Sequence, residues 1–207
     1  ETVSAQAKAL SEYRAQTLER FITAVTEQLA FLNMPNVILV GKHTTGKLTI
    51  HGMDSLEFLI SANRGEEPRP LARIASGGEL SRIMLALKCG IADRDSIPTL
   101  IFDEIDTGVS GEIADRMADI MQEMGEQNRQ VISITHLPQI AARGRAHYKV
   151  YKRDNDTETN SHIRRLTDEE RVEELAHMLS GATLTEAALS NARALLEPSL
   201  KERKIIK

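Results

Sequence analysis

Ala75-Ser76-Gly77-Gly78-Glu79-Leu80-Ser81-Arg82 is followed by an amphipathic run from Ile83 to Lys88. Two glycines after a hydroxyl residue let the backbone approach a ligand closely. The first turn of a helix leaves unpaired N–H groups with a partial positive charge behind them, and this arrangement binds anions such as phosphate. We therefore predict an anion site at the start of this helix. The simpler alternative is that Ser76 is an ordinary helix cap.

Two later segments are apolar runs that end in polar residues. Residues 98–104 end in Asp103 and Glu104, and residues 130–136 end in Thr135 and His136. Both runs are typical of buried parallel strands. In open α/β sheets the ligand lies at the carboxyl ends of the strands, so these polar residues are candidates for one site.

The three candidate side chains suit chemistry on a phosphate. Asp103 could hold Mg²⁺, usually through a water molecule, and Glu104 could polarise a hydrolytic water. His136 beside a phosphate would be a hydrogen-bond donor to it. The alternatives are a solvated strand end for the two acids and a satisfied core position for the histidine.

The composition indicates an ordinary globular protein. The 207 residues are 41% hydrophobic and 27% charged, with a formal net charge of −4 that gives no argument for nucleic-acid binding by the chain as a whole. The single Cys89 excludes an internal disulfide framework. No apolar run approaches the roughly 20 residues of a membrane span. Because the chain starts with Glu1 and has no secretory signal pattern, we expect it to be a piece of a longer protein.

Residues 1–33 are predicted to form one long helix. Apolar residues recur at spacings of three and four, and neither glycine nor proline interrupts the run before Asn33-Met34-Pro35. The length suits the end of a coiled coil, with an amphipathic surface helix as the alternative. We therefore divide the chain into residues 1–33, the root of an arm, and residues 34–207, a globular part.

Residues 36–62 are predicted to form three strands, at 36–40, 47–51 and 57–61, with a turn at Gly52-Met53-Asp54-Ser55. The segment 41–47 fits the phosphate-loop pattern G-x-x-x-x-G-K. A working loop of this kind needs Ser or Thr next and then a helix. Here Leu48 follows, with a strand-like pattern after it, so we interpret 41–48 as a hairpin loop without a phosphate site.

The rest of the chain alternates helices with strands. Gly125, Gly181 and Pro198 are expected to end helices. The predicted helices lie at about 77–92, 112–124, 167–180 and 183–196, and two further strands are expected at 148–151 and 162–166.

The order of these motifs resembles the ATP-binding-cassette ATPases, with a signature loop, a Walker B strand and a switch histidine. Residues 75–88, 100–111 and 134–142 resemble, more specifically, the C-terminal head segment of the RecN family of SMC-like ATPases, which act in bacterial DNA repair. The resemblance covers nearly the whole chain. It implies an α/β P-loop NTPase head, of which this chain is the C-terminal lobe. We thus expect a mostly parallel sheet flanked by helices, with an N-terminal coiled-coil-root helix and a small antiparallel β segment.

The resemblance also implies roles for individual residues. Ser76, Gly77, Gly78 and Glu79 would form the signature loop, which contacts ATP bound to the opposite head. Asp103 would be the Walker B magnesium residue and Glu104 the catalytic carboxylate. His136 would be the switch histidine, and Asp106 lies in the loop that crosses the dimer.

One departure limits what the chain can do alone, because nothing in it matches the family's Walker A lysine. We expect half a head, inactive by itself, whose partners are the N-terminal half of the same head, a second copy in an ATP-dependent dimer, and DNA through the full-length protein. We expect ATP and Mg²⁺ as cofactors, a cytoplasmic location at the nucleoid and no membrane contact. The rival interpretations are the head of another SMC-like or RecF-like ATPase and an inert dimerisation module.

Overall fold

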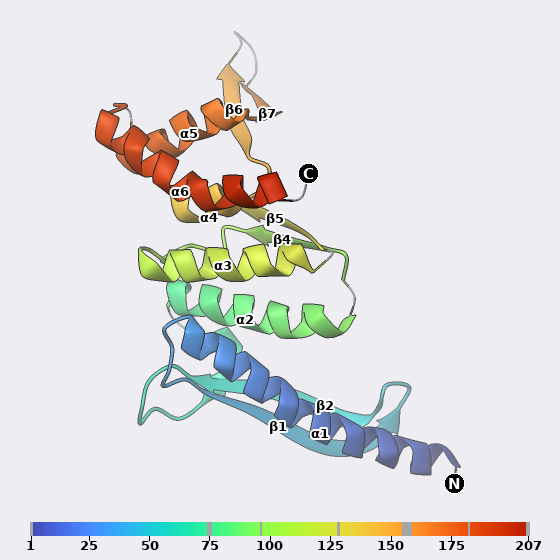
Figure 1. The fold of residues 1–207 in the computed structure, drawn as a ribbon. Coiled ribbons are helices and arrows are strands. Elements are labelled where there is room, and N and C mark those ends of the chain that lie inside the picture. Colours follow the sequence, from blue (N-terminus) through green and yellow to red (C-terminus); the bar gives the residue numbers. More distant parts are fainter. Residues whose placement is uncertain are drawn as a thin grey trace. The chain divides into compact units, whose positions relative to one another are not determined.

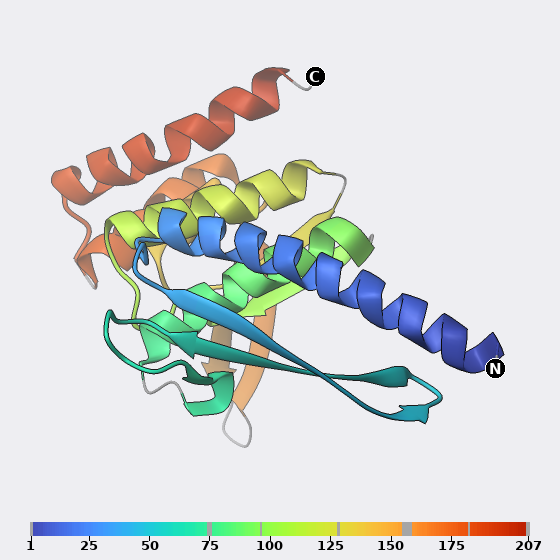
Figure 2. The same cartoon turned by 90° about the horizontal axis from the view of Figure 1, so that it is seen from below.

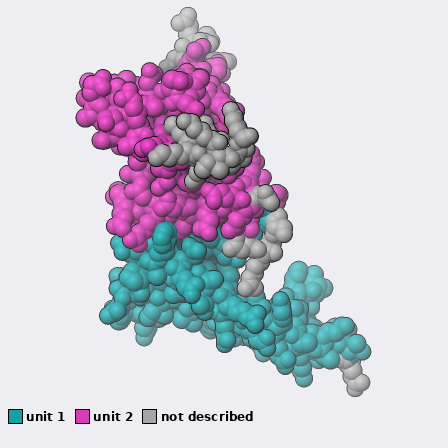
Figure 3. Space-filling model, in the orientation of Figure 1, with its two compact units in different colours: residues 1–97 teal, residues 98–207 magenta. Residues whose placement is uncertain are grey.

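The computed structural model describes residues 2–73, 76–95, 97–127, 129–154, 159–181 and 183–205. The chain divides into two compact units, residues 1–97 and residues 98–207, coloured separately in Figure 3.

Unit 1 begins with the long helix α1, Thr2–Phe31. It ends where predicted, because Asn33 adopts a left-handed conformation with φ 61°. The Asn33 N–H donates to Ala30 O at 3.1 Å and the Met34 N–H to Leu29 O at 2.9 Å. These two bonds form a Schellman motif, which satisfies the last carbonyls of the helix.

Helix α1 lies along a three-stranded antiparallel sheet (Figures 1 and 2). The strands are β1, Ile38–Thr49, β2, Gly52–Ser61, and the short β3, Arg69–Pro70, and a 3-10 turn, Leu71–Arg73, follows. The prediction for this region was wrong in detail. Segment 41–48 belongs to β1 rather than to a loop, and the chain turns at residues 50–51 instead of 52–55. Burial alternates from Ile38 to His43, through Gly41, and pairing with β2 continues to Thr45 and again at Thr49 although residues 44–49 are all exposed.

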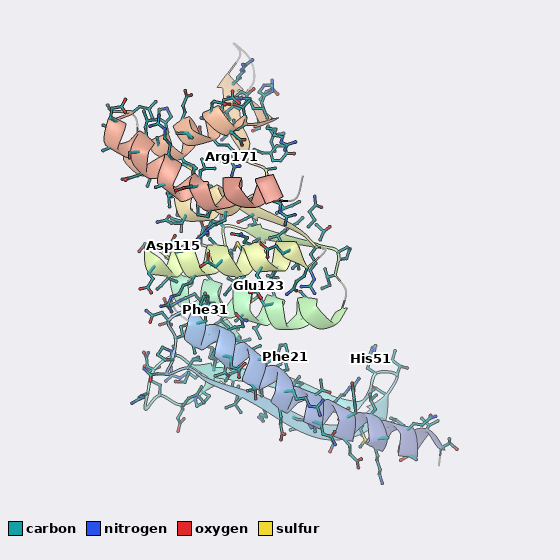
Figure 4. The ribbon with its side chains drawn as sticks, in the orientation of Figure 1. Phe21, Phe31, His51, Asp115, Glu123 and Arg171 are labelled. Carbon is teal, nitrogen blue, oxygen red and sulfur yellow. The ribbon has the colours of Figure 1, made fainter. Side chains whose placement is uncertain are left out.

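Helix α2, Gly77–Asp95, completes unit 1 and packs against α1. The two helices approach closely at Gly90, where a Cβ atom would lie 2.9 Å from the Phe21 ring. Phe21 also contacts Phe58 of β2, with ring centroids 5.7 Å apart, and Figure 4 shows Phe21 on α1. The fully buried centre of the unit, at 0–1% exposure, consists of Val25, Leu29, Leu32, Ile83, Leu85, Ala86 and Ala92.

Unit 2 contains the predicted parallel strands. Strands β4, Thr99–Asp103, and β5, Gln130–Ile134, pair in parallel, and helix α3, Glu112–Glu126, connects them. Phe102 is 1% exposed, and the helix buries Met117, Met121 and Met124. Gly125 lies inside α3, so its predicted role as a helix end was wrong.

The remainder of unit 2 is a helical layer with a hairpin. It comprises α4, Pro138–Arg143, the antiparallel strands β6, Tyr148–Asp154, and β7, Thr159–Arg165, and the helices α5, Asp168–Ser180, and α6, Glu186–Ile205. Helices α4, α5 and α6 share a core of Ala142, Leu175, Ala176, Ala188, Ala192 and Leu196. Gly181 ends α5 as predicted, with φ 75°. Helix α6 continues through Pro198, so the predicted end there was wrong.

Among the helices of the described residues, none is long and apolar enough to cross a membrane.

Candidate functional site

The glycine stretch forms the N-terminus of α2 in unit 1. Ser76 precedes the helix, and its Oγ accepts a long, 3.4 Å hydrogen bond from the Glu79 N–H. Gly77 and Gly78 form the first turn, and a Cβ atom added at Gly77 would meet no atom of the described residues within 4 Å. Gly77 is therefore helical rather than conformationally special, and it leaves open space in front of the helix start. Ala75 lies outside the described residues.

Arg82 connects this helix start to the end of α1. Its Nε donates to Gly78 O at 3.1 Å, and one of its terminal nitrogens donates to Leu32 O at 3.2 Å. The guanidinium thereby satisfies one of the carbonyls left at the end of α1. The position of the glycine stretch within unit 1 thus depends on the long helix.

The two acids of the Walker B resemblance lie where β4 ends in unit 2. Asp103 pairs with Ile134 in the register of the parallel strands. Glu104 has a left-handed backbone with φ 48°, and its N–H donates to Ile134 O at 3.0 Å. A non-glycine residue in this region is sterically disfavoured, and such residues cluster at functional sites. The bend turns the chain out of the strand, so the two neighbouring carboxylates need not point to opposite faces.

A polar cluster joins the two strand ends. Asp106 is fully buried, and its Oδ2 accepts a hydrogen bond from the Thr135 hydroxyl. Its Oδ1 lies 3.6 Å from Nδ1 of His136, whose side chain is 64% exposed. Unit 2 therefore brings Asp103, Glu104, Asp106 and His136 to the carboxyl ends of β4 and β5.

Two further residues, neither given an individual role by the sequence, support this segment. Thr135 accepts a 2.9 Å hydrogen bond from the Leu137 N–H, in addition to donating to Asp106. Arg171 of α5 is 1% exposed and donates to Ala142 O at 3.2 Å and to Gly144 O at 2.7 Å, at the end of α4 (Figure 4). The hydroxyl beside His136 was a signal for the first. Nothing in the sequence indicated the role of Arg171, which is one charged residue among the acids of an amphipathic helix.

The two acids alone would not complete the coordination sphere of a metal ion. No group of three or more His, Cys, Asp or Glu side chains within the described residues could hold a metal ion. Mg²⁺ is often bound by one or two carboxylates, with waters and substrate phosphates as the other ligands. Asp103 and Glu104, both exposed at the strand end, fit this sparse kind of site.

Solved structures share the fold of this chain. The chain is similar to the Smc head domain with a coiled coil and joint from Pyrococcus yayanosii, with a TM-score of 0.63, 24% identity and coverage of 80% of this chain and 30% of that one. It is also similar to an SMC ATPase studied for ATP-driven dimerization and DNA-stimulated activation, with a TM-score of 0.56, 22% identity and coverage of 84% and 99%. The fold is that of an SMC-type ATPase head.

Sequence relatives show a more specific similarity. The chain is 40% identical over 199 residues to the DNA repair protein RecN of Haemophilus influenzae, covering 95% of this chain and 36% of RecN. It is 42% identical over 207 residues to RecN of Treponema pallidum, covering 95% and 35%. No family model matches the chain. The chain is thus similar to a segment of RecN, and it spans about a third of the length of these relatives.

Proposed function

We propose that the chain is the C-terminal segment of an ATPase head in a RecN-like DNA repair and recombination protein. The observation that carries this proposal is the meeting of Glu104 with Ile134, because it sets an acid pair beside the switch histidine in a chain similar to RecN. An N-terminal segment of the same protein would supply the Walker A loop and complete the nucleotide site. The described segment alone would bind ATP weakly and would not hydrolyse it.

The proposed roles follow the chemistry of each position. Glu104 polarises the attacking water, and the exposed His136 donates to the terminal phosphate. Asp103 holds Mg²⁺ through a water molecule, and the bound ion would neutralise phosphate charge. Ser76, Gly77, Gly78 and Glu79 present the N-terminus of α2 to ATP held by the second copy. The open space at Gly77 supports this, since a ligand could approach the backbone there.

The proposed dimer also uses the loop that starts at Asp106. The Asp106 side chain is buried, but Thr107, Gly108 and Ser110 of the same loop are exposed. We propose that these exposed residues cross to the second copy, while Asp106 stays within its own unit.

Residues 1–33 are proposed as the root of a coiled-coil arm, and residues 34–207 as part of the head. Leu10 and Tyr13 continue the apolar stripe of α1, yet they are 40% and 66% exposed, whereas Val25 and Leu29 are buried. A second arm helix would cover the exposed part of the stripe. The whole protein would act on DNA in the cytoplasm.

The first test is Glu104→Gln in the full-length protein. The change keeps the shape of the side chain and removes the base. ATP hydrolysis should therefore fall by about 10²–10⁴-fold, while ATP-bound dimers accumulate. Turnover is measured by phosphate release and dimers by analytical ultracentrifugation. Glu123→Gln, at an exposed position of α3, is the matched control and should hydrolyse ATP normally. Normal turnover by the Glu104 variant would contradict its catalytic role.

The second test asks whether the glycine stretch acts on the partner's nucleotide. Ser76→Arg places a bulky cation at the open helix start, so hydrolysis and ATP-dependent dimerisation should be lost together. ATP binding to a single head should remain. Mixing this variant with a protein that lacks its Walker A lysine should restore part of the activity, because one composite site is then intact. If Ser76→Arg abolished ATP binding by isolated monomers, the stretch would act within its own head.

A further inference from the structure

Asp106 is a buried acid whose hydrogen bonding is only half complete. Its side chain is 1% exposed, and Oδ2 accepts from the Thr135 hydroxyl. Oδ1 is buried and has no hydrogen-bond partner among the described residues. Burying a carboxylate oxygen without a donor is unfavourable, so this atom should take up a nearby donor.

His136 offers that donor. Its Nδ1 lies 3.6 Å from Asp106 Oδ1, which is just beyond a hydrogen bond of 2.7–3.2 Å. Because the imidazole is 64% exposed, a small rotation about its side-chain bonds can close the distance. The bond would join the only unsatisfied oxygen of Asp106 to the ring that faces solvent.

Thr135 holds the backbone around the histidine in place. Its hydroxyl donates to Asp106 and accepts the Leu137 N–H at 2.9 Å, so both neighbours of His136 are fixed by one side chain. Helix α4 follows directly and is held at its far end by Arg171. Hydrogen bonds therefore hold the backbone on both sides of the histidine, and the exposed imidazole can turn about its side-chain bonds.

We propose that Asp106 is the positioning residue of His136. Asp106 Oδ1 accepts the Nδ1–H of the ring, which fixes the ring orientation and directs Nε2 outward. When Nε2 also carries a proton, the carboxylate balances the positive charge of the imidazolium, as an aspartate does in serine hydrolases. This role rests on the proposed function of His136 toward a phosphate, but the tautomer of the resting ring does not depend on it.

The resting tautomer can be measured in this chain by NMR with ¹⁵N-labelled histidine at about pH 8, where an ordinary imidazole is neutral. His136 should show the Nδ1–H tautomer. His43 is an internal reference, because its Nε2 contacts Asp54 at 2.8 Å and should favour the opposite tautomer. A wild-type His136 with the Nε2–H pattern would overturn the proposal without any variant.

Two matched substitutions separate positioning from general stability. Asp106→Asn should change the His136 signals and leave those of His43 unchanged, and Asp54→Asn should do the reverse. Unchanged His136 signals in a folded Asp106→Asn chain would overturn the proposal.

In the full-length protein, Asp106→Asn should lower kcat for ATP by about tenfold or more, the scale of losing an orienting partner of a functional imidazole, with KM little changed. Thr135→Val should also lower kcat, whereas Thr135→Ser, which keeps the hydroxyl, should retain a near-normal kcat. A normal kcat in Asp106→Asn would overturn the positioning role if Glu104→Gln is inactive. If Glu104→Gln is fully active, the proposed function fails, while the tautomer result still decides the pairing of Asp106 with His136.

Discussion

Asp54 in unit 1 and Asp106 in unit 2 are two largely buried acids, each with a hydroxyl and a histidine beside it. Asp54 accepts hydrogen bonds from Ser11 at 2.5 Å and Arg14 at 2.7 Å, and it also contacts His43. These hydrogen bonds, chiefly that of Ser11, hold the Asp54 pKa at about 2, below its usual 3.8. Asp106 has no comparable cation and keeps one oxygen without a partner among the described residues. A complete network fixes structure, whereas an incomplete one leaves a group available for a ligand or a moving side chain.

The same contrast holds for two residues with left-handed backbones. Asn33 tolerates this conformation and uses it to end α1 in a Schellman motif. Glu104 is not a helix cap, and in its left-handed conformation its carbonyl accepts hydrogen bonds from the Thr107 N–H at 3.2 Å and the Thr107 hydroxyl at 2.9 Å, at the start of the loop after β4. The strain at Glu104 is thus a feature of the site, while the one at Asn33 is ordinary helix termination.

The largest effects on stability are expected from two arginines, Arg171 in unit 2 and Arg14 in unit 1. Arg171→Ala should lower the free energy of unfolding by about 3 kcal/mol, because it removes two hydrogen bonds to backbone carbonyls and leaves a cavity where a buried side chain was. Arg14→Ala should cost less, since Arg14 is 40% exposed and Asp54 keeps two other partners. Urea unfolding followed by circular dichroism measures both changes. Arg171→Met, which keeps most of the volume, should recover part of the loss, and equal losses for Arg171→Ala and Arg14→Ala would break the comparison.

A smaller effect of opposite sign is expected at the strained glutamate. Glu104→Gly should raise the free energy of unfolding by up to about 1 kcal/mol, because glycine adopts this backbone without a steric penalty. Glu123→Gly in α3 is the control and should lower it by about 1 kcal/mol, as glycine does within a helix. A loss of stability in both variants would show that Glu104 is unstrained.

The smallest effects are expected from acid titration, which should weaken the two units in different pH ranges. Burial, with the charge of Arg171, lowers the pKa of His147 below 6.5. The neutral ring is therefore favoured on folding, and stability is lost as the pH falls through 6.5. Asp54 contributes above its usual pKa of 3.8, and that contribution is lost as the pH falls toward about 2.

Urea unfolding of single variants across pH separates these contributions. Replacing His147 with Gln should remove the loss just below pH 6.5, and Asp54→Asn should remove the loss below about 4. Glu170, whose pKa is lowered first by the Thr167 backbone and then by Arg164, adds a loss only below its usual 4.5. A His147 variant that follows the wild-type curve between pH 6.5 and 4.5 would contradict the assignment.

Sequence reasoning reached the parts of the fold that have strong local signals. The parallel pair ending in Asp103 and Ile134 follows from two apolar runs, and the end of α1 follows from Asn33-Met34-Pro35. The full extent of β1 could not be predicted, because Gly41 and Gly46 suggested a loop. Gly41 instead lies in the strand where the Leu18 side chain needs space. Pro198 inside α6 shows likewise that packing of a helix can outweigh a local signal.

The candidate site was predictable only in outline. Residue types and order pointed to Asp103, Glu104 and His136, since each follows or ends an apolar strand. The bonds of Thr135 and the burial of Asp106 depend on how the loop after β4 folds back, and no periodicity encodes that. The left-handed Glu104 could not be predicted either, because nothing about a glutamate signals a positive φ.

The close approaches of α1 to two glycines have a mechanical consequence. A Cβ atom at Gly41 would lie 2.7 Å from Leu18, and one at Gly90 would lie 2.9 Å from Phe21. The absence of a Cβ atom at each glycine thus leaves the space that one side chain of the helix fills. If α1 slid by one turn, about 5.4 Å, Leu18 and Phe21 would move away from these glycines and toward residues that carry a Cβ atom. These two contacts therefore oppose sliding of the long helix along its own axis within unit 1.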